Sequence, residues 1–365
     1  MDWFTVTNID EIDSPSLMLY KERVEHNIQY AINMIKDVSK FRPHVKTNKI
    51  AEVCEMMMTA GITKFKCATI AEAEMLAMIH AEDVLLAYQP AGPKAKRLLS
   101  LVQKYSQTNF SCLVDNIDAA NYLSEFFLSA KESIFVFIDL NTGMDRSGIK
   151  PEKAFALFEH LQKLPAINVR GLHAYDGHLR NPDLQERKKE SDLAFKKVMC
   201  LAEQIEKASG LSLTIVAGGS PSFPTHVDRN VECSPGTFIF WDWDYKHQLP
   251  DERFDYAVLV VTRVISVVDN DTITTDLGHK SIAAENPLPR VHFLNASDAV
   301  PASQSEEHLV LKVNDSSHFK VGDVLYGVPV HICPTVALYE KAVVVENNKA
   351  ITSWKVIARD RTITI

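Results

Sequence analysis

Lys46 is the residue of this sequence with the clearest potential for chemistry, because it lies where a short extended segment gives way to a helical pattern. Pro43 favours extended geometry in the residue before it, and apolar residues recur at helical spacing from Lys49 onward. A lysine at the C-terminal end of a parallel strand can form a Schiff base when neighbouring cations keep its amine uncharged, and Arg42, His44 and Lys49 are neighbours in sequence. The alternative is a solvated basic cluster.

Two small, donor-rich loops come late in the same half of the chain. Gly218-Gly219-Ser220 follows an apolar run, and Ser234-Pro235-Gly236-Thr237 follows the next one. Paired glycines let backbone N–H groups approach an anion, and barrel enzymes commonly bind phosphate in the loops after strands seven and eight. Each loop alone could be a plain turn. A phosphate site together with a reactive lysine favours pyridoxal phosphate (PLP) as cofactor.

Two further segments could serve the same site. Arg146 lies in the loop Asn141 to Gly148, where its guanidinium could reach a cofactor oxygen or a substrate carboxylate; the alternative is a charged loop in which Arg146 pairs with Asp145 or Asp139. Strand alternation would place His173 and Tyr175 on one face of the next strand, and Gly177 would free His178 to point into the barrel mouth.

His331 and Cys333 form a possible metal pair. In extended backbone a His-x-Cys spacing projects both side chains to the same side, which suits two ligands of one Zn²⁺ with water or substrate completing the shell. The soft thiolate favours zinc over manganese. The alternative is a packed cysteine beside a hydrogen-bonded histidine.

The elements that must position these residues alternate between short apolar runs and amphipathic stretches. With the run ending at Lys46 and one near 231–233, they give eight strands, so the sequence predicts a parallel α/β (β/α)₈ TIM barrel. The other expected strands are 64–69, 83–88, 110–114, 134–140, 169–175 and 213–217, and the expected helices include 71–80, 117–127, 151–164 and 185–209.

After about Trp243 the pattern becomes almost entirely β, which predicts a C-terminal mainly-β domain. We expect the barrel over residues 12–245 and the β domain over 246–365, with Thr5 and Val6 in residues 1–11 adding a strand to it. Its expected strands are 256–268, 272–275, 307–313, 324–326, 341–345 and 356–365.

Composition narrows the classes of function. The 365 residues are 46% hydrophobic and 24% charged, with a net charge of −8, and the pI is near 5.9. An acidic chain lacks the basic face of a general nucleic-acid binder. No apolar run is long enough for a membrane span, the N-terminus lacks the order of a signal peptide, and the six cysteines lack paired spacing. We therefore expect a cytoplasmic protein without disulfides, and without nucleic-acid or membrane partners.

In order along the chain, these motifs resemble those of the D-threonine aldolase and D-serine dehydratase family. This family belongs to the fold-type III PLP enzymes, which share the alanine racemase barrel. The resemblance runs from about residue 12 to 360. It rests on Pro43 to Thr47, Cys67 to Thr69 with Glu72 and Glu74, Asn141 to Gly148, Tyr175 to His178, Gly218 to Ser220, Pro235 to Thr237, Ser305 to His308, and His331 with Cys333.

The resemblance implies a role for each matched residue. Lys46 would form the Schiff base with PLP, Tyr175 would be the active-site tyrosine, and Arg146 would lie beside the cofactor ring. His331 and Cys333 match the family's metal pair, which is His-x-Asp in some aldolases and His-x-Cys in dehydratases. The family often has histidine where this chain has Asn48, and the spacing from Tyr175 to His178 is shorter than in some aldolases. Gly218, Gly219, Ser220, Gly236 and Thr237 would bind the phosphate.

The favoured interpretation is a PLP- and metal-dependent D-threonine aldolase that cleaves a D-3-hydroxy amino acid to glycine and an aldehyde, with His178 or a metal-bound hydroxide as the base. The runner-up is a D-serine or D-threonine dehydratase, in which Lys46 removes the α-proton to give a 2-oxo acid and ammonia. An amino acid racemase and a non-catalytic PLP carrier stay open. The resemblance also implies a homodimer with shared active sites. Tyr88, Gln89, Trp241 and Trp243 are candidates for the substrate wall, with core or interface packing as the alternative.

Overall fold

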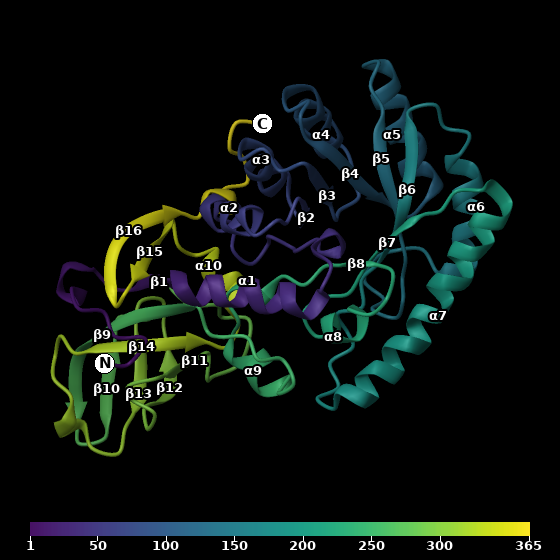
Figure 1. Ribbon diagram of the computed structural model, residues 1–365. Helices are drawn as coiled ribbons and strands as arrows, with labels where there is room; N and C mark the ends of the chain where they lie inside the picture. The colour runs from purple at the N-terminus through teal and green to yellow at the C-terminus, as the bar shows by residue number, and fades with distance from the viewer. The chain divides into compact units, whose positions relative to one another are not determined.

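The computed structural model describes all 365 residues, and its larger sheet-and-helix part is a parallel barrel (Figure 1). Seven strands are hydrogen-bonded in the order β2-β3-β4-β5-β6-β7-β8, and every neighbouring pair is parallel. Their apolar runs are buried, as a parallel sheet covered by helices requires. The strands are β2 (Lys64–Cys67), β3 (Asp83–Leu86), β4 (Asn109–Val114), β5 (Ile134–Asp139), β6 (Ile167–Ala174), β7 (Thr214–Ala217) and β8 (Glu232–Cys233).

The segment that ends at Lys46 supplies the eighth position of the barrel. Arg42 N donates to Cys233 O at 2.9 Å on the β8 side, and Val45 N donates to Lys66 O at 2.9 Å on the β2 side. Pro43 has no N–H to donate, which keeps this ladder short. Parallel bridges Phe41 to Cys233 and His44 to Lys66 nevertheless join it to both neighbours. The predicted (β/α)₈ barrel is confirmed.

Helices follow the barrel strands, and α4 to α7 lie outside the parallel sheet in Figure 1. Several begin at residues that satisfy their free N–H groups: Thr69 caps α3, Asn116 caps α5 and Asp183 caps α7. Inside the barrel, Leu85, Leu113, Phe137 and Val216 form an apolar core. The helices are α1 (Lys21–Ile35), α2 (Ala51–Thr59), α3 (Ile70–Met78), α4 (Pro93–Lys104), α5 (Ile117–Ser129), α6 (Pro151–Leu161), α7 (Leu184–Ser209) and α8 (Phe223–His226).

The remaining strands form a separate nine-stranded sheet. Its main path runs β12-β13-β10-β9-β1-β15-β16, and β14 pairs with β9 and β11. The C-terminal mainly-β domain is confirmed, with two short helices, α9 (Trp243–Gln248) and α10 (Ile332–Val336). The strands are β1 (Ser16–Tyr20), β9 (Val258–Asp269), β10 (Thr272–Thr275), β11 (Val291–Phe293), β12 (Val300–Gln304), β13 (Leu309–Lys312), β14 (Val324–Pro329), β15 (Lys341–Glu346) and β16 (Lys349–Lys355).

Some predicted strands of this sheet are wrong. Residues 356–365 contain no strand, because β16 ends at Lys355 and the backbone N–H groups of Thr364 and Ile365 donate to the carboxylate of Glu74. Thr5 and Val6 also lie outside the strands. The N-terminal strand is β1, which pairs with β9 on one side and β15 on the other and whose apolar side chains are buried. β11, β12 and β16 were not predicted from the sequence.

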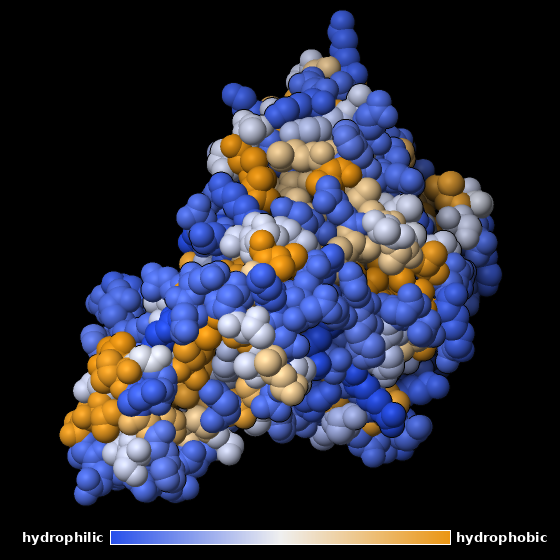
Figure 2. Space-filling view, turned by 60° about the vertical axis from the view of Figure 1, so that its left-hand side comes forward, coloured by the Kyte–Doolittle hydropathy of each residue, from blue (hydrophilic) through white to orange (hydrophobic).

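By their internal contacts, the residues divide into two compact units. One, here called the strand-rich unit, comprises 1–30, 47–53 and 237–359; the other, the barrel unit, comprises 31–46, 54–236 and 360–365. No helix is both long enough and apolar enough to cross a bilayer. All six cysteines are free, and four of them are buried. The face drawn in Figure 2 is mostly hydrophilic with separate apolar patches.

Candidate active site

A cavity of about 580 Å³ opens at the C-terminal ends of the barrel strands. This end of a parallel barrel is where strand termini and loops converge on a ligand. Two of the four candidate wall residues line it, Tyr88 and Gln89, whereas Trp241 is fully buried against Phe254 in the strand-rich unit. The lining residues include His44, Lys46, Lys66, Asp115, Asp139, Arg146, Ser147, His173 and Tyr175.

Lys46 lies in this cavity with an uncommitted amine. Its backbone N–H donates to His44 Nδ1 at 3.2 Å, and its side chain makes no hydrogen bond or ion pair. The expected influence of Arg42 on it is not supported by the geometry. Arg42 is fully buried between Asp83 and Glu232, each 2.6 Å away, so its charge is already matched. Lys46 is therefore free to react with an aldehyde.

Arg146 and Tyr175 lie together in the same cavity. The guanidinium carbon of Arg146 is 5.1 Å from the centroid of the Tyr175 ring. The alternative of a charged loop is wrong for this arginine, because Asp145 accepts from Asn141 and Asp139 accepts from Ser147 and a histidine instead. Arg146 is left available for an anionic group of a ligand.

Lys66 is a second lysine in the cavity, and the sequence analysis missed it. It is 2% exposed, and its Nζ lies 3.5 Å from His173 Nε2. His173 Nδ1 lies 2.7 Å from Asp139 Oδ1. Burial and the positive charge of Lys46 lower the pKa of Lys66 to about 7. The alternation of Lys64, Phe65 and Lys66 in a predicted barrel strand was the available signal, since it puts both lysines on one face.

The glycine loop after β7 has the shape of an anion cradle. Gly218 has φ +81°, and a Cβ placed on Gly219 would lie 2.9 Å from the Tyr175 ring, so only glycine lets the ring pack against this loop. The loop after β8 joins it, because Gly236 N donates to Ser220 Oγ at 3.3 Å. Four of the five predicted phosphate residues are thereby brought together. The fifth, Thr237, belongs to the strand-rich unit.

Asp176 supports this loop from behind. It accepts from Ser222 Oγ and lies 2.7 Å from His226 Nε2, while Ser222 Oγ accepts from Gly219 N at 3.1 Å. Burial alone would raise the pKa of Asp176, but its bonds to His226 and Ser222 hold it below the ordinary value. The only signal for Asp176 in the sequence was its position next to Tyr175. The uncommitted amine of Lys46, the free Arg146 and the glycine cradle together fit PLP.

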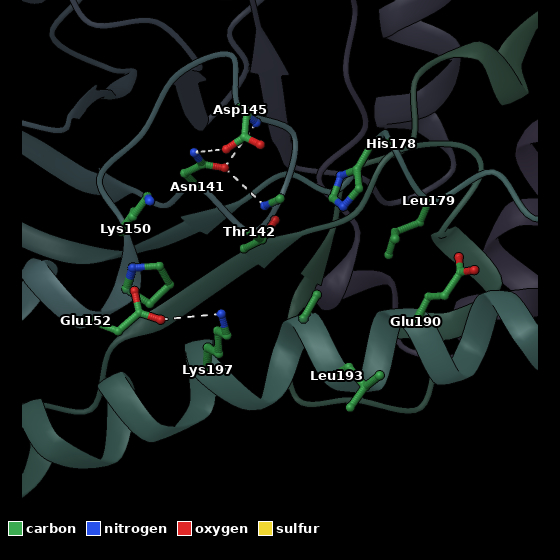
Figure 3. Close-up of a pocket in the computed structure, with 13 residues that line it drawn as sticks. Asn141, Thr142, Asp145, Lys150, Glu152, His178, Leu179, Glu190, Leu193 and Lys197 are labelled. Atoms are coloured by element: carbon green, nitrogen blue, oxygen red, sulfur yellow. Dashed lines mark hydrogen bonds and ion pairs between the residues drawn. The ribbon is translucent and has the colours of Figure 1, made fainter.

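His178 lies outside the lysine cavity. Figure 3 shows its ring between the loop Asn141 to Asp145 and helix α7, where it lines a neighbouring cavity of about 670 Å³. A Cβ on Gly143 would lie 2.8 Å from His178 Nε2, so the glycine makes room for this ring. The structure therefore brings Lys46, Arg146 and Tyr175 together but leaves His178 apart from them.

His331 and Cys333 meet in the strand-rich unit, but the expected extended geometry is wrong. His331 is the N-cap residue of α10, and Cys333 lies in the first turn of this helix. They still interact: burial lowers the pKa of His331, but its hydrogen bond to Cys333, the charge of Cys333 and the bond to Glu285 outweigh burial and raise it to about 9. An imidazole and a thiol that face each other fit a zinc ion. No group of three or more histidine, cysteine and carboxylate ligands is present.

Two carboxylates hold this turn in place. Glu285 Oε1 lies 2.5 Å from His331 Nδ1, and buried Asp242 accepts from Tyr245 N at 3.0 Å and from Ile332 N at 3.2 Å. Asp242 is thus the N-cap of α9 and also accepts the first backbone N–H of α10. Two hydroxyls face the sulfur, with Thr47 Oγ1 at 3.1 Å and Thr237 Oγ1 at 3.6 Å from Cys333 Sγ. Asn48 caps its own turn by accepting from Ile50 N at 3.0 Å.

Comparison with known protein families decides how this arrangement is classified. The family described as "Alanine racemase, N-terminal domain" matches residues 20–242, more than half of the chain. The chain belongs to this family. A second description, "Putative serine dehydratase domain", matches residues 257–345. The two descriptions fall on the barrel and on the β sheet, in the order that the resemblance implied.

Similar proteins in this family cover nearly the whole chain. D-threonine aldolase of Arthrobacter sp is 26% identical over 95% of this chain and 93% of its own length. 3-hydroxy-D-aspartate aldolase of Paracoccus denitrificans is 27% identical over 96% of this chain and 93% of its own. A crystal structure of D-threonine aldolase from Filomicrobium marinum is 25% identical with a TM-score of 0.88, covering 96% of both chains.

Dehydratases are related as well. D-threo-3-hydroxyaspartate dehydratase of Delftia sp. is 23% identical over 94% of this chain and 97% of its own length. A cysteine mutant of D-threo-3-hydroxyaspartate dehydratase has been solved in a form described as metal-free. Aldolases and dehydratases are both lyases, and this member of the alanine racemase-like PLP family is an enzyme of that class.

Proposed function

We propose that this protein is a PLP- and metal-dependent lyase of D-3-hydroxy amino acids, and that its main reaction is the retro-aldol cleavage of D-threonine to glycine and acetaldehyde. The observation that carries this proposal is the cavity in which the free amine of Lys46 lies with Arg146 and Tyr175. Full-length similarity to D-threonine aldolases supports the same choice.

The residues of the barrel unit account for cofactor binding. PLP, when bound, supplies an electron sink for the negative charge left on the substrate α-carbon. Lys46 would hold it through its amine, while Arg146 and Tyr175 would contact its ring. The cradle of Gly218, Gly219, Ser220 and Gly236 would bind the phosphate through backbone and hydroxyl donors.

A divalent metal, with zinc favoured over manganese, would be held by His331 and Cys333. It would act as a Lewis acid that lowers the pKa of a substrate hydroxyl. Glu285 would fix the imidazole so that Nδ1 is occupied and Nε2 is left for the metal. The metal-free form of the related dehydratase supports metal dependence in this family.

His178 remains the proposed base, and its position makes this role testable. Its ring would have to reach the cavity of Lys46 from the neighbouring one. General base catalysis contributes about 10²- to 10⁴-fold. A loss of that size in His178→Gln with unchanged PLP affinity supports the role. A smaller effect assigns the proton transfer to another group.

The second candidate is D-serine or D-threonine dehydratase, and Cys333 is the residue that favours it. The resemblance gives His-x-Cys as the pair of dehydratases, and dehydratases are among the similar proteins. In that reaction Lys46 would remove the α-proton, and the metal would make the hydroxyl a leaving group.

We further propose a homodimer with shared active sites, which would cover exposed apolar side chains of the strand-rich unit such as Val268 and Val321.

A product assay separates these functions. Purified protein is incubated with PLP, D-threonine and either Zn²⁺, Mn²⁺ or a chelator. Acetaldehyde and glycine that disappear with chelator support a metal-dependent aldolase, whereas 2-oxobutyrate and ammonia support the dehydratase. If neither pair of products forms, the assignment moves to a racemase or a PLP carrier. The His331→Ala variant should lose lyase activity, and unchanged activity would refute the metal proposal.

A further inference from the structure

Arg146 enters the cavity of Lys46 from a loop, and its own side chain is weakly held. The side chain is exposed and makes no hydrogen bond or ion pair, and its guanidinium carbon lies 5.1 Å from the centroid of the Tyr175 ring. An arginine side chain has many rotamers, so the direction of its backbone decides how much freedom it loses on binding a ligand. The conformation of the loop therefore matters for any ligand of Arg146.

The backbone of this loop is in an unusual conformation. Gly143 has φ +126°, Asp145 has φ +52° and Gly148 has φ +92°. Asp145 directly precedes Arg146, and left-handed backbone at a residue other than glycine is unfavourable unless its surroundings impose it. The direction in which Arg146 leaves the loop thus depends on what holds Asp145.

Asn141 is the residue that holds Asp145. Its Oδ1 accepts from Gly143 N at 3.0 Å and from Asp145 N at 3.2 Å, and its Nδ2 donates to Asp145 Oδ1 at 2.9 Å (Figure 3). Short polar side chains commonly fix turns in this way. One amide group therefore restrains both the backbone and the side chain of Asp145.

The loop is anchored separately on the C-terminal side of Arg146. Ser147 Oγ donates to Asp139 Oδ2 at 3.1 Å, and Gly148 N donates to Asp115 Oδ2 at 3.2 Å. These bonds follow Arg146 in the chain and do not reach the left-handed turn that precedes it. Both sides of Arg146 are thus fixed, but by different residues.

Asn141 is placed to act on a ligand through Arg146 and not by direct contact. It lines the neighbouring cavity of about 670 Å³ together with His178, and it is absent from the lining of the cavity of Lys46. Arg146, in contrast, lines the cavity of Lys46. The loop thus has one of these residues on each of the two cavities.

We propose that Asn141 is the positioning residue of Arg146: by fixing the turn at Asp145, it aims the guanidinium into the cavity of Lys46 and so raises the affinity for PLP. This inference rests on the proposed function, in which Arg146 contacts the cofactor. The resemblance includes Asn141 only as the first residue of its loop and assigns it no role.

The first measurement is a double-mutant cycle on the Kd of the apoprotein for PLP, read by absorbance titration. We expect Asn141→Ala to raise this Kd about tenfold and Arg146→Ala to raise it about 100-fold, because the guanidinium makes the charge-assisted contact itself. In the Arg146→Ala background, Asn141→Ala should change the Kd by less than about twofold, since the side chain that it positions is gone. A residue that only stabilises the fold would give additive effects.

An exchange of the two side chains gives a second test. In Asn141→Asp the carboxylate can still accept from both backbone N–H groups, but it lies against the carboxylate of Asp145, so PLP affinity should fall. Adding Asp145→Asn restores the hydrogen bond with donor and acceptor exchanged. The Kd of this double variant should return to within about twofold of wild type.

Asn181→Ala is the matched control. Asn181 also fixes a turn, because its Oδ1 accepts from Asp183 N at 3.1 Å and its Nδ2 donates to Glu190 Oε1 at 3.3 Å, and it does not line the cavity of Lys46. Its loss should leave PLP affinity unaltered. Far-UV circular dichroism checks that each variant is folded.

Several outcomes overturn the inference. An unchanged Kd in Asn141→Ala, or additive losses in the cycle, would show that Asn141 does not act through Arg146. No recovery in the exchanged variant would refute the role of its bond to Asp145, and an equal loss in Asn181→Ala would make the effect a general destabilisation. Failure of the proposed function is distinct: wild type would then bind PLP with the same dependence on Asn141 but form none of the lyase products. A wild type that binds no PLP would refute both.

Discussion

Glu285 and His331 lie 2.5 Å apart through Oε1 and Nδ1, and this contact fixes which imidazole nitrogen is left for a metal. The carboxylate faces Nδ1, so Nε2 is the nitrogen that a metal would take, displacing its proton. Carboxylate partners of metal-binding histidines commonly set the tautomer and ring orientation in this way. The same turn is tied at its other end by Asp242, which accepts from Ile332 N.

Removing the Glu285 carboxylate should weaken the binding of the metal directly. We expect Glu285→Ala to raise the Kd for Zn²⁺ by about 10- to 100-fold, because the imidazole loses its orientation. The Kd of Glu285→Gln should lie between those of wild type and Glu285→Ala, since the amide oxygen can still accept from Nδ1–H. Competition with a chromogenic chelator measures the affinity without substrate or cofactor. Glu307→Gln, which removes a surface partner of Lys280, is the control. Equal affinities for wild type and Glu285→Ala would refute this role.

Lys46 should be required both for the visible absorbance of bound PLP and for catalysis. We expect Lys46→Ala to lose the visible absorbance of covalently bound PLP and at least about 10³-fold in kcat, because no other group can replace the attacking amine. Absorbance spectra and product formation measure the two effects. Lys94→Ala serves as the control for loss of a lysine charge. A coloured and active Lys46→Ala protein would place the cofactor lysine elsewhere, and Lys66 would be the next residue to examine.

Asp176 should act on PLP affinity through the loop that it supports. The carboxylate holds Ser222, and Ser222 accepts from Gly219 N, so the loop loses an anchor in Asp176→Asn. We expect the Kd of the apoprotein for PLP to rise about tenfold, since a hydrogen bond to a charged group is worth about 1.5–3 kcal/mol and part of the contact survives with asparagine. Absorbance titration with PLP measures it.

Asp183→Asn is the matched control for Asp176. Asp183 caps α7 by accepting from Gln185 N and Glu186 N, away from the cradle. This variant should change stability but leave PLP affinity unaltered. If both variants weaken PLP binding to the same extent, the effect comes from general destabilisation and the role of Asp176 in the loop is refuted.

The parts of the fold that could be predicted are those fixed by local pattern. Alternating apolar runs and amphipathic helices gave the barrel, and Lys46, Arg146 and Tyr175 converge because strand ends of a parallel barrel meet. Residues 356–365 alternate like a strand, yet their backbone donors find a distant acceptor in Glu74. A pattern of one segment contains no information on such a partner.

The missed site residues have the same explanation. Lys66 and Asp176 matter through contacts across the barrel, with His173 and His226, more than 40 residues away along the chain. The prediction of an extended segment at His331 failed because Asp242, from another part of the chain, accepts the first backbone N–H of the helix that begins there. Side-chain chemistry at a chain position is readable from sequence, whereas the partner that orients it is set by packing.

Arg42 should be one of the main determinants of barrel stability, because it joins the strands at which the barrel closes. Its guanidinium contacts Asp83 of β3 and Glu232 of β8, while Asp83 also pairs with Arg170 and Glu232 with Lys64. Arg42→Met would remove the buried cation that Asp83 and Glu232 share and leave each carboxylate with only its less buried partner, Arg170 or Lys64. We expect it to lower the free energy of unfolding by about 3–5 kcal/mol at neutral pH. Urea unfolding followed by circular dichroism measures the change.

The pH dependence of this loss follows from Asp83. Burial alone would raise the pKa of Asp83, but Arg42 and Arg170 outweigh it and hold it below the ordinary value. Its folded pKa is therefore lower than its unfolded pKa of about 3.9, so its stabilising contribution is present above that pH and is lost as the pH falls through the folded pKa. The difference between wild type and Arg42→Met should shrink on acidification below about pH 4. A double variant with Asp83→Asn should be less destabilised than the sum of the two single changes, because the second change removes a buried charge that the first left with one partner fewer. Additive losses, or a difference that is constant down to acid pH, would show that Arg42 acts by packing alone.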